Sequence, residues 1–157
     1  MSLVLVRLDD RLIHGQVAVG WVHELSADRI LLIDDAVAAN EWERELYTLG
    51  VPPDVEVEFA ATEQAGMVLD RCAESEQRTI VVIADVDTLV AVCGASKAVK
   101  DVNVGGVHEG AGRTRRLRYV FLSEAEAAKL SLLSQQGVAI SAQDVPTAKS
   151  VPLAGFT

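Results

Sequence analysis

The chain has 157 residues, of which 50% are hydrophobic and 24% are charged, with a formal net charge of −9. This length supports one domain with a full core, and the composition is that of a soluble globular protein. Such an acidic chain is a poor candidate for binding nucleic acid, whose phosphates attract Lys and Arg. The N-terminal segment is too short and too charged for a signal peptide, and no apolar run approaches the roughly 18 residues of a membrane span. We therefore expect a cytoplasmic protein.

The first elements alternate between strand and helix. An aliphatic, β-branched run predicts a strand over residues 3–8, followed by a polar turn over 9–14. Residues 15–25 have helical spacing, since Val17, Trp21 and Leu25 are four apart. A continuous apolar run then predicts a second strand at 30–33.

The middle of the chain repeats this alternation. A helix is expected over 40–49, ending before Gly50 and Pro52. Strict apolar–polar alternation predicts a strand at 55–60, and Thr62 can cap a helix over 63–72. The next predicted elements are a buried strand at 79–84 and a short helix at 86–93.

The last third contains a Gly- and Arg-rich loop between two strands. A short strand at 102–104 leads into Gly105 and Gly106, the loop covers 107–116, and strand character returns at 118–122. Ser123 and Glu126 form a capping-box motif that opens a helix to about residue 136. A final strand follows at 138–142, and residues 146–157 are expected to form an irregular tail.

Regular alternation of strands and helices predicts the fold class. We expect an α/β fold in one domain over residues 1–157, with an open, mostly parallel sheet of about seven strands and helices on both faces. In such folds ligands bind at the carboxyl edge of the sheet, beside helix N-termini. The turn at residues 9–14 lies at this edge.

His14 is the candidate nucleophile of this turn. A neutral imidazole is nucleophilic, and here it would stand beside the first amides of a helix, which attract anions. The amides of Gly15, Gln16 and Val17 could hold the oxygens of a phosphoryl group, and Arg11 could present a planar fork to the same oxygens. Phosphoryl transfer depends mainly on such positioning and charge stabilisation.

Asp10 has two candidate supporting roles. It could accept a hydrogen bond from the imidazole and so fix its tautomer, or it could anchor the guanidinium of Arg11. A single histidine in a turn is more often structural than catalytic. The residue types of this turn therefore indicate, by themselves, only an anion-binding pocket.

Other residues are weaker candidates. Asp35 follows the second strand and could order the site or be a plain turn residue, while Gly105 and Gly106 could bring amides to the site or form only a turn. His108 could approach the site or face solvent. No ligand cluster indicates a metal, no nucleotide motif is present, and we expect no cofactor. Cys72 and Cys93 are expected to be buried thiols, and Trp21 and Trp42 to cover core edges. The arginine cluster could form a solvated strand face or contact a partner or a phosphate; it consists of Arg113, Arg115, Arg116 and Arg118.

The segment LVRLDDRLIHGQVAVGW closely resembles the opening of the B components of the mannose/fructose/sorbose family of phosphoenolpyruvate-dependent sugar phosphotransferase systems. The resemblance continues at ADRILLIDDAVAANEWER, DVNVGG, GRTRRL and GVAI, and covers roughly residues 3–145. It implies the open α/β fold and a phosphorylated histidine, here His14, contacted by Arg11.

The resemblance also implies partners and an activity. His14 would accept a phosphoryl group from a phosphohistidine on a separate IIA protein and pass it to a hexose or related sugar held by the membrane components IIC and IID. The protein would be a cytoplasmic sugar phosphotransferase associated with a membrane permease, and a homodimer is plausible by resemblance alone. Two alternatives stay open: a regulatory phosphocarrier without a sugar acceptor, and a non-enzymatic module that binds small anions.

Overall fold

The computed structural model of this protein describes residues 2–157, so Met1 of the expected 1–157 domain lies outside the described residues. Its main sheet has seven strands in the order β3-β2-β4-β1-β5-β8-β9, and every pairing is parallel except that of β8 with β9. The prediction of a single α/β domain with a mostly parallel sheet is confirmed. The strands of this sheet are β1 (Leu3–Leu8), β2 (Arg29–Ile33), β3 (Glu56–Ala60), β4 (Thr79–Ile83), β5 (Asp101–Val104), β8 (Ala139–Ala142) and β9 (Val151–Pro152).

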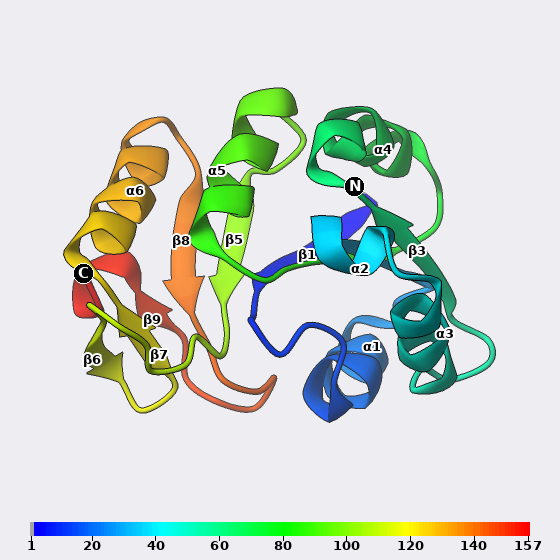
Figure 1. Cartoon of the computed structure of the whole chain (residues 1–157), viewed down its shortest axis with the longest axis horizontal. Helices are drawn as coiled ribbons and strands as arrows, with labels where there is room; N and C mark the ends of the chain where they lie inside the picture. The colour runs from blue at the N-terminus through cyan, green and yellow to red at the C-terminus, as the bar shows by residue number, and fades with distance from the viewer. Residues whose placement is uncertain (1) are drawn as a thin grey trace.

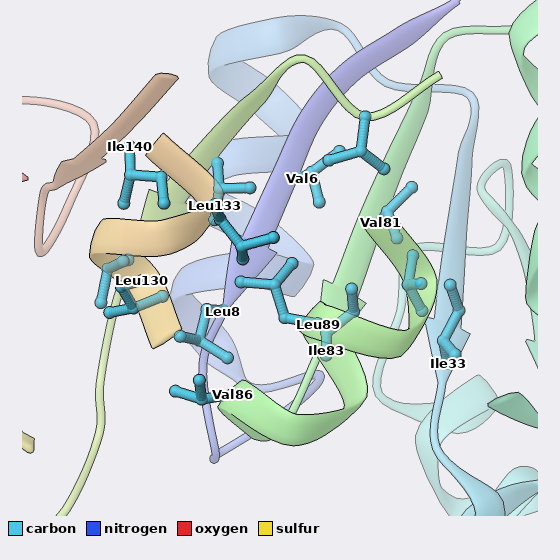
Figure 2. Packing of buried hydrophobic residues seen from close by; sticks show 14 of the residues in the cluster. Val6, Leu8, Ile33, Val81, Ile83, Val86, Leu89, Leu130, Leu133 and Ile140 are labelled. Atoms are coloured by element: carbon cyan, nitrogen blue, oxygen red, sulfur yellow. The ribbon is translucent and has the colours of Figure 1, made fainter. Parts of the chain in front are cut away.

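Three helices cover one face of the sheet, and they lie in a row in Figure 1. They are α4 (Thr62–Glu74), α5 (Val86–Ala95) and α6 (Glu124–Gln135). Figure 2 shows Leu89 of α5 and Leu130 of α6 directed toward Leu8 and Ile83 of the central strands. Because these side chains are fully buried, this layer forms the larger part of the core.

The other face is covered near β2 and β4 by the first helical segment and by α3 (Glu41–Leu49). The first segment contains η1 (Gln16–Trp21), a π-helix, and α1 (Val22–Leu25), and the short helix α2 (Asp35–Ala38) precedes α3. Val17 and Trp21 pack against Ile30 and Val82 on this face. The predicted helical spacing of residues 15–25 therefore describes the buried side correctly, although the first part widens into a π-helix.

Two segments differ from the predictions. The strand expected at 118–122 is present as β7 (Val120–Leu122), but the end of the loop expected at 107–116 forms a further strand, β6 (Thr114–Leu117). The two strands pair antiparallel in a separate hairpin. The tail expected to be irregular from residue 146 contributes the edge strand β9 and the 3-10 turn η2 (Leu153–Gly155). Phe156, only 3% exposed, joins the larger core. A two-residue strand that contains a proline is too short to show a periodicity.

Candidate active site

The carboxyl end of β1 places the turn that contains His14 at the edge of the sheet. Asp9 follows the last residue of β1 and donates its amide to the carbonyl of Ile83, which ends β4. The amide of Leu12 donates to the carbonyl of Asp9, which closes the turn. The chain then enters η1 through His14 and Gly15. This is the sheet edge at which the fold class predicts a ligand site.

Asp9 is the centre of the polar contacts of this turn. Its side chain has 0% exposure, and its carboxylate oxygens accept hydrogen bonds from three other side chains. Arg7 Nε lies 3.2 Å from Oδ2, Arg11 Nη2 lies 2.9 Å from Oδ2, and His14 Nε2 lies 3.2 Å from Oδ2. The backbone amide of Arg11 donates to Oδ1. A buried carboxylate is stable only with such partners.

These contacts keep Asp9 ionised. Burial alone would raise the pKa of the Asp9 carboxyl, but the hydrogen bonds from His14 and Arg11 and the charges of Arg7 and Arg11 hold that pKa well below its ordinary value. The carboxylate therefore accepts hydrogen bonds and does not donate one near neutral pH.

Arg7 supports Asp9 from within the fold. Its side chain is fully buried, and its guanidinium donates to the carbonyls of Gln143 and Asp144 at 2.9 and 2.8 Å, as well as to Asn103. It also lies 5.2 Å from the centre of the Trp21 ring, a distance suited to a cation–π contact. Burial lowers the pKa of Arg7 and the neighbouring Asp9 opposes this shift. Because Arg7 has partners on several elements, it ties Asp9 to the loop after β8.

The contacts of His14 define its tautomer in the neutral ring. Nε2 faces the Asp9 carboxylate, which can only accept, so Nε2 carries the proton. Nδ1 lies 3.3 Å from the amide nitrogen of Gln16, which can only donate, so Nδ1 carries the lone pair. The imidazole is 19% exposed. The arrangement leaves the lone pair on Nδ1 of a partly exposed ring.

Arg11 binds Asp9 through two parallel hydrogen bonds, from Nε at 3.0 Å to Oδ1 and from Nη2 at 2.9 Å to Oδ2. This fork geometry explains why the pKa of Arg11 is raised, with the hydrogen bond to Asp9 as the main cause. The side chain remains 33% exposed. The predicted pair of Arg11 and His14 is thus brought together, and one carboxylate links them.

The turn holds a strained residue. Leu12 has a φ of +58°, in the left-handed region that non-glycine residues seldom adopt, while its side chain is buried in the smaller core cluster. Such a conformation costs about 1–2 kcal/mol and persists only where the surroundings impose it. The burial of Leu12 and of the adjacent Ile13 supplies that constraint within the turn.

Both candidate roles of Asp10 are wrong. Its carboxylate accepts hydrogen bonds from the backbone amide of His108 at 2.8 Å and lies 2.6 Å from Nδ1 of the same residue. Asp10 therefore fastens the loop after β5 to the turn, and its neighbour Asp9 contacts His14 and Arg11 instead. His108 is close to the site through this contact, yet its side chain is 67% exposed.

Gly105 and Gly106 give space to the arginines. The Gly105 amide donates to the Leu8 carbonyl, so it is used within the sheet and does not face a ligand. A Cβ at Gly105 would lie 2.3 Å from Arg7 Nη2, and one at Gly106 would lie 2.8 Å from Arg11 Nε. The two glycines are needed because the guanidinium groups pass directly over them.

The other candidates have structural contacts. Asp35 accepts a hydrogen bond from the amide of Thr62 at 2.6 Å and so joins α2 to α4. This hydrogen bond does not involve Asp9 or His14. Trp21 is buried as expected, but Trp42 is 69% exposed, so the prediction that it covers a core edge is wrong. Most of the arginine cluster is paired with carboxylates, through Arg113–Glu126, Arg116–Glu124 and Arg118–Asp144.

Sequence reasoning missed Asp9 and Arg7. A partial signal was present, because residues 7 and 9 are two apart where β1 ends and so point to one side of it. That spacing places Asp9 beside Arg7, whereas the position of Arg11 depends on the turn that follows.

Comparison with known proteins extends the similarity over the whole chain. The family model of the PTS system sorbose subfamily IIB component matches residues 3–156. The chain belongs to this family. It is therefore a sugar-specific phosphotransfer component of the phosphotransferase system, as the resemblance in the sequence implied. Membership implies IIA, IIC and IID partners within that system.

Individual relatives agree with this assignment. The N-acetylgalactosamine-specific phosphotransferase enzyme IIB component 2 of Escherichia coli is 30% identical and covers 97% of this chain and 96% of its own length. The crystal structure of manxB from Thermoanaerobacter tengcongensis is 29% identical with a TM-score of 0.87, over 98% of this chain and 93% of that one. The IIBSor domain of the sorbose permease from Klebsiella pneumoniae is 26% identical with a TM-score of 0.89, over 99% of this chain and 96% of that one.

Within residues 2–157, none of the helices combines the length and the apolar character that crossing a bilayer requires.

Proposed function

We propose that His14 of this IIB component carries the phosphoryl group on Nδ1. It accepts the group from a phosphohistidine on a IIA protein and passes it to a hexose or related sugar during uptake through a IIC/IID permease. The contact between His14 Nε2 and the Asp9 carboxylate carries this proposal, because it keeps the proton on Nε2 and leaves the lone pair on Nδ1.

In the first transfer, the P–N bond of the donor histidine breaks as the bond from phosphorus to His14 Nδ1 forms. Nε2 keeps its proton, so the phosphorylated ring gains positive charge, which the ionised Asp9 stabilises at 3.2 Å. In the second transfer, a sugar hydroxyl oxygen attacks phosphorus and its proton leaves to water. The bond to Nδ1 breaks, and His14 returns to its neutral form.

The surrounding groups stabilise the phosphoryl oxygens in this proposal. Arg11 is one-third exposed beside His14 and supplies a positive charge, and Asp10 supports the site by holding the neighbouring loop. The amides of Gly15, Gln16 and Val17 lie at the start of η1, where unpaired donors attract anions. The Gln16 amide, which contacts Nδ1 in the unmodified ring, is free to turn to a phosphoryl oxygen once Nδ1 is phosphorylated.

Intact-mass measurement tests the carrier role. The protein is incubated with phosphoenolpyruvate, the two general phosphotransferase proteins and a mannose-class IIA protein, beside His14→Ala. We expect an acid-labile gain of about 80 Da, the mass of one phosphoryl group, that is absent from the variant. No gain with a donor set active on another IIB protein would contradict the proposal and favour an anion-binding module.

Transfer to sugar requires a second assay. Phosphorylated protein is mixed with IIC/IID membranes and candidate hexoses, and the loss of phosphohistidine is followed with the appearance of sugar phosphate. Sugar-dependent loss supports the transport role. A stable phosphohistidine in the presence of a working permease favours the regulatory alternative.

A further inference from the structure

Helix α3 presents an apolar stripe to solvent. Trp42, Leu46 and Leu49 are 69%, 48% and 82% exposed, and their spacing of four and three residues places them on one side of the helix. None of the residues of α3 is buried. Large apolar side chains gathered in this way on a polar surface mark interaction sites.

The packing of α3 on the sheet does not use this stripe. Tyr47 packs against the core cluster that also contains Val17 and Trp21. Arg44 donates to the carbonyl of Ala38 and holds the helix to α2. Because the helix is fixed from its other side, the exposed stripe needs a different explanation.

Carboxylates border the stripe. Glu41, Glu43 and Glu45 lie beside it, and none of them forms an ion pair within residues 2–157. The helix dipole accounts for acidic residues in the first turn, where Glu41 and Glu43 lie, but it does not account for Glu45. The surface therefore combines apolar contact area with unpaired negative charge.

A shallow groove adjoins this surface between α3 and the edge strand β3. It has a volume of about 480 Å³, and it is lined by Glu41, Arg44, Glu45, Thr48, Leu49 and Phe59, so that two carboxylates and one guanidinium border it. The groove adds a concave area in which an apolar side chain of a partner can be seated.

We propose that this α3 surface docks a basic, partly apolar cytoplasmic loop of the membrane component that holds the sugar, an inference that rests on the proposed function. Cytoplasmic loops of membrane proteins are rich in Lys and Arg, which complement the glutamates around the stripe. A second copy of this chain would set the same glutamates against each other. Anionic lipid headgroups would be repelled by them.

The position of α3 suits this role. Figure 1 shows α3 beside α1, and its first residues follow α2 at the carboxyl end of β2. Since β2 runs parallel to β1 through their shared neighbour β4, Trp42 lies toward the same sheet edge as His14. A loop bound along the stripe is thus anchored on the side of the molecule that carries η1, without covering the His14 ring itself.

Binding to the purified IIC and IID components of the same sugar system, held in lipid nanodiscs, tests the proposal. The double variant Trp42→Ala/Leu49→Ala is expected to bind about tenfold more weakly than the unmodified protein. Glu45→Lys is expected to weaken binding several-fold and to reduce its dependence on salt. Leu132→Ala, a control at a 54% exposed leucine on α6, is expected to bind normally.

Phosphorylation of His14 by the IIA protein separates this proposal from the carrier role. The α3 variants should be phosphorylated at the normal rate, because the stripe does not include the His14 turn. If the unmodified protein is not phosphorylated, the carrier role itself is contradicted. Normal nanodisc binding by Trp42→Ala/Leu49→Ala overturns the docking proposal. Light scattering that shows a dimer for the unmodified protein and a monomer for this variant also overturns the docking proposal, because the α3 surface then binds a second copy of the chain.

Discussion

His14 and Asp9 form the contact on which the site depends, since Nε2 of the imidazole lies 3.2 Å from a carboxylate oxygen with no solvent exposure. The adjacent carboxyl group, that of Asp10, belongs to a different contact with His108. Two neighbouring aspartates therefore serve separate purposes, and substitutions can distinguish them.

Asp9→Asn is expected to slow phosphorylation of His14 by about 100-fold, because an amide can present its N–H₂ to Nε2 and reverse the tautomer. The rate is measured by intact mass, and ¹⁵N chemical shifts of the His14 ring report the tautomer. Asp10→Asn is the matched control and should leave the His14 ring shifts unchanged. An unchanged rate and tautomer in a folded Asp9→Asn protein would refute this assignment.

Gly105→Ala should impair both folding and phosphorylation, because the added Cβ would lie 2.3 Å from Arg7 Nη2 and 2.6 Å from Asp9 Oδ2. We expect a loss of about 1–3 kcal/mol in the free energy of unfolding, measured with urea. Gly15→Ala is the control for stability only, since its Cβ would meet nothing within 4 Å and its φ is −49°. Equal stability of the two variants would show that Gly105 is not needed for the packing of Arg7.

Glu126→Gln tests the link between the hairpin loop and α6 as a function of pH. Burial raises the pKa of Glu126, but the paired hydrogen bonds from Arg113 and those from Ser123 outweigh this and lower it overall. A lowered folded-state pKa gives stability that is present above the unfolded-state pKa of about 4.3 and is lost as the pH falls through the folded-state value.

The variant should therefore be about 1 kcal/mol less stable than the unmodified protein at pH 7, and the difference should shrink below about pH 4. Urea unfolding at a series of pH values measures it. A difference that stays constant down to pH 2 would mean that the ion pair is not its source.

Phe156→Ala should destabilise the protein by about 3 kcal/mol, since the ring is 3% exposed within the larger core. The unfolding midpoint provides the measurement. Met67→Ala, at a side chain that is 74% exposed, should change the free energy of unfolding by less than about 0.5 kcal/mol. Equal effects of the two substitutions would contradict the placement of the tail against the core.

The sequence predicts those parts of this molecule that repeat a periodic pattern. The buried runs of β2 and β4 and the spacing of Val17 and Trp21 were enough for the α/β fold, because apolar periodicity reflects which side of an element is buried. The edge strand β9 lacks this signal, since pairing with β8 determines it rather than its own two residues.

Within the site, His14 and Arg11 could be predicted because the turn after the first strand is where the fold binds ligands. The choice between Asp9 and Asp10 required the direction of each side chain at the end of β1. Trp42 shows a similar limit, since hydrophobicity alone does not distinguish a residue that faces the core from one that faces solvent.

The double hydrogen bond between Arg11 and Asp9 has a consequence for the energy of the phosphorylated state. A carrier must release its phosphoryl group as readily as it accepts it, so tight binding of that group would lower its transfer potential. Because Asp9 already neutralises much of the charge of Arg11, this guanidinium attracts phosphoryl oxygens less strongly than a free arginine would. In the proposed mechanism, Asp9 thereby weakens the hold of Arg11 on the phosphoryl group of His14.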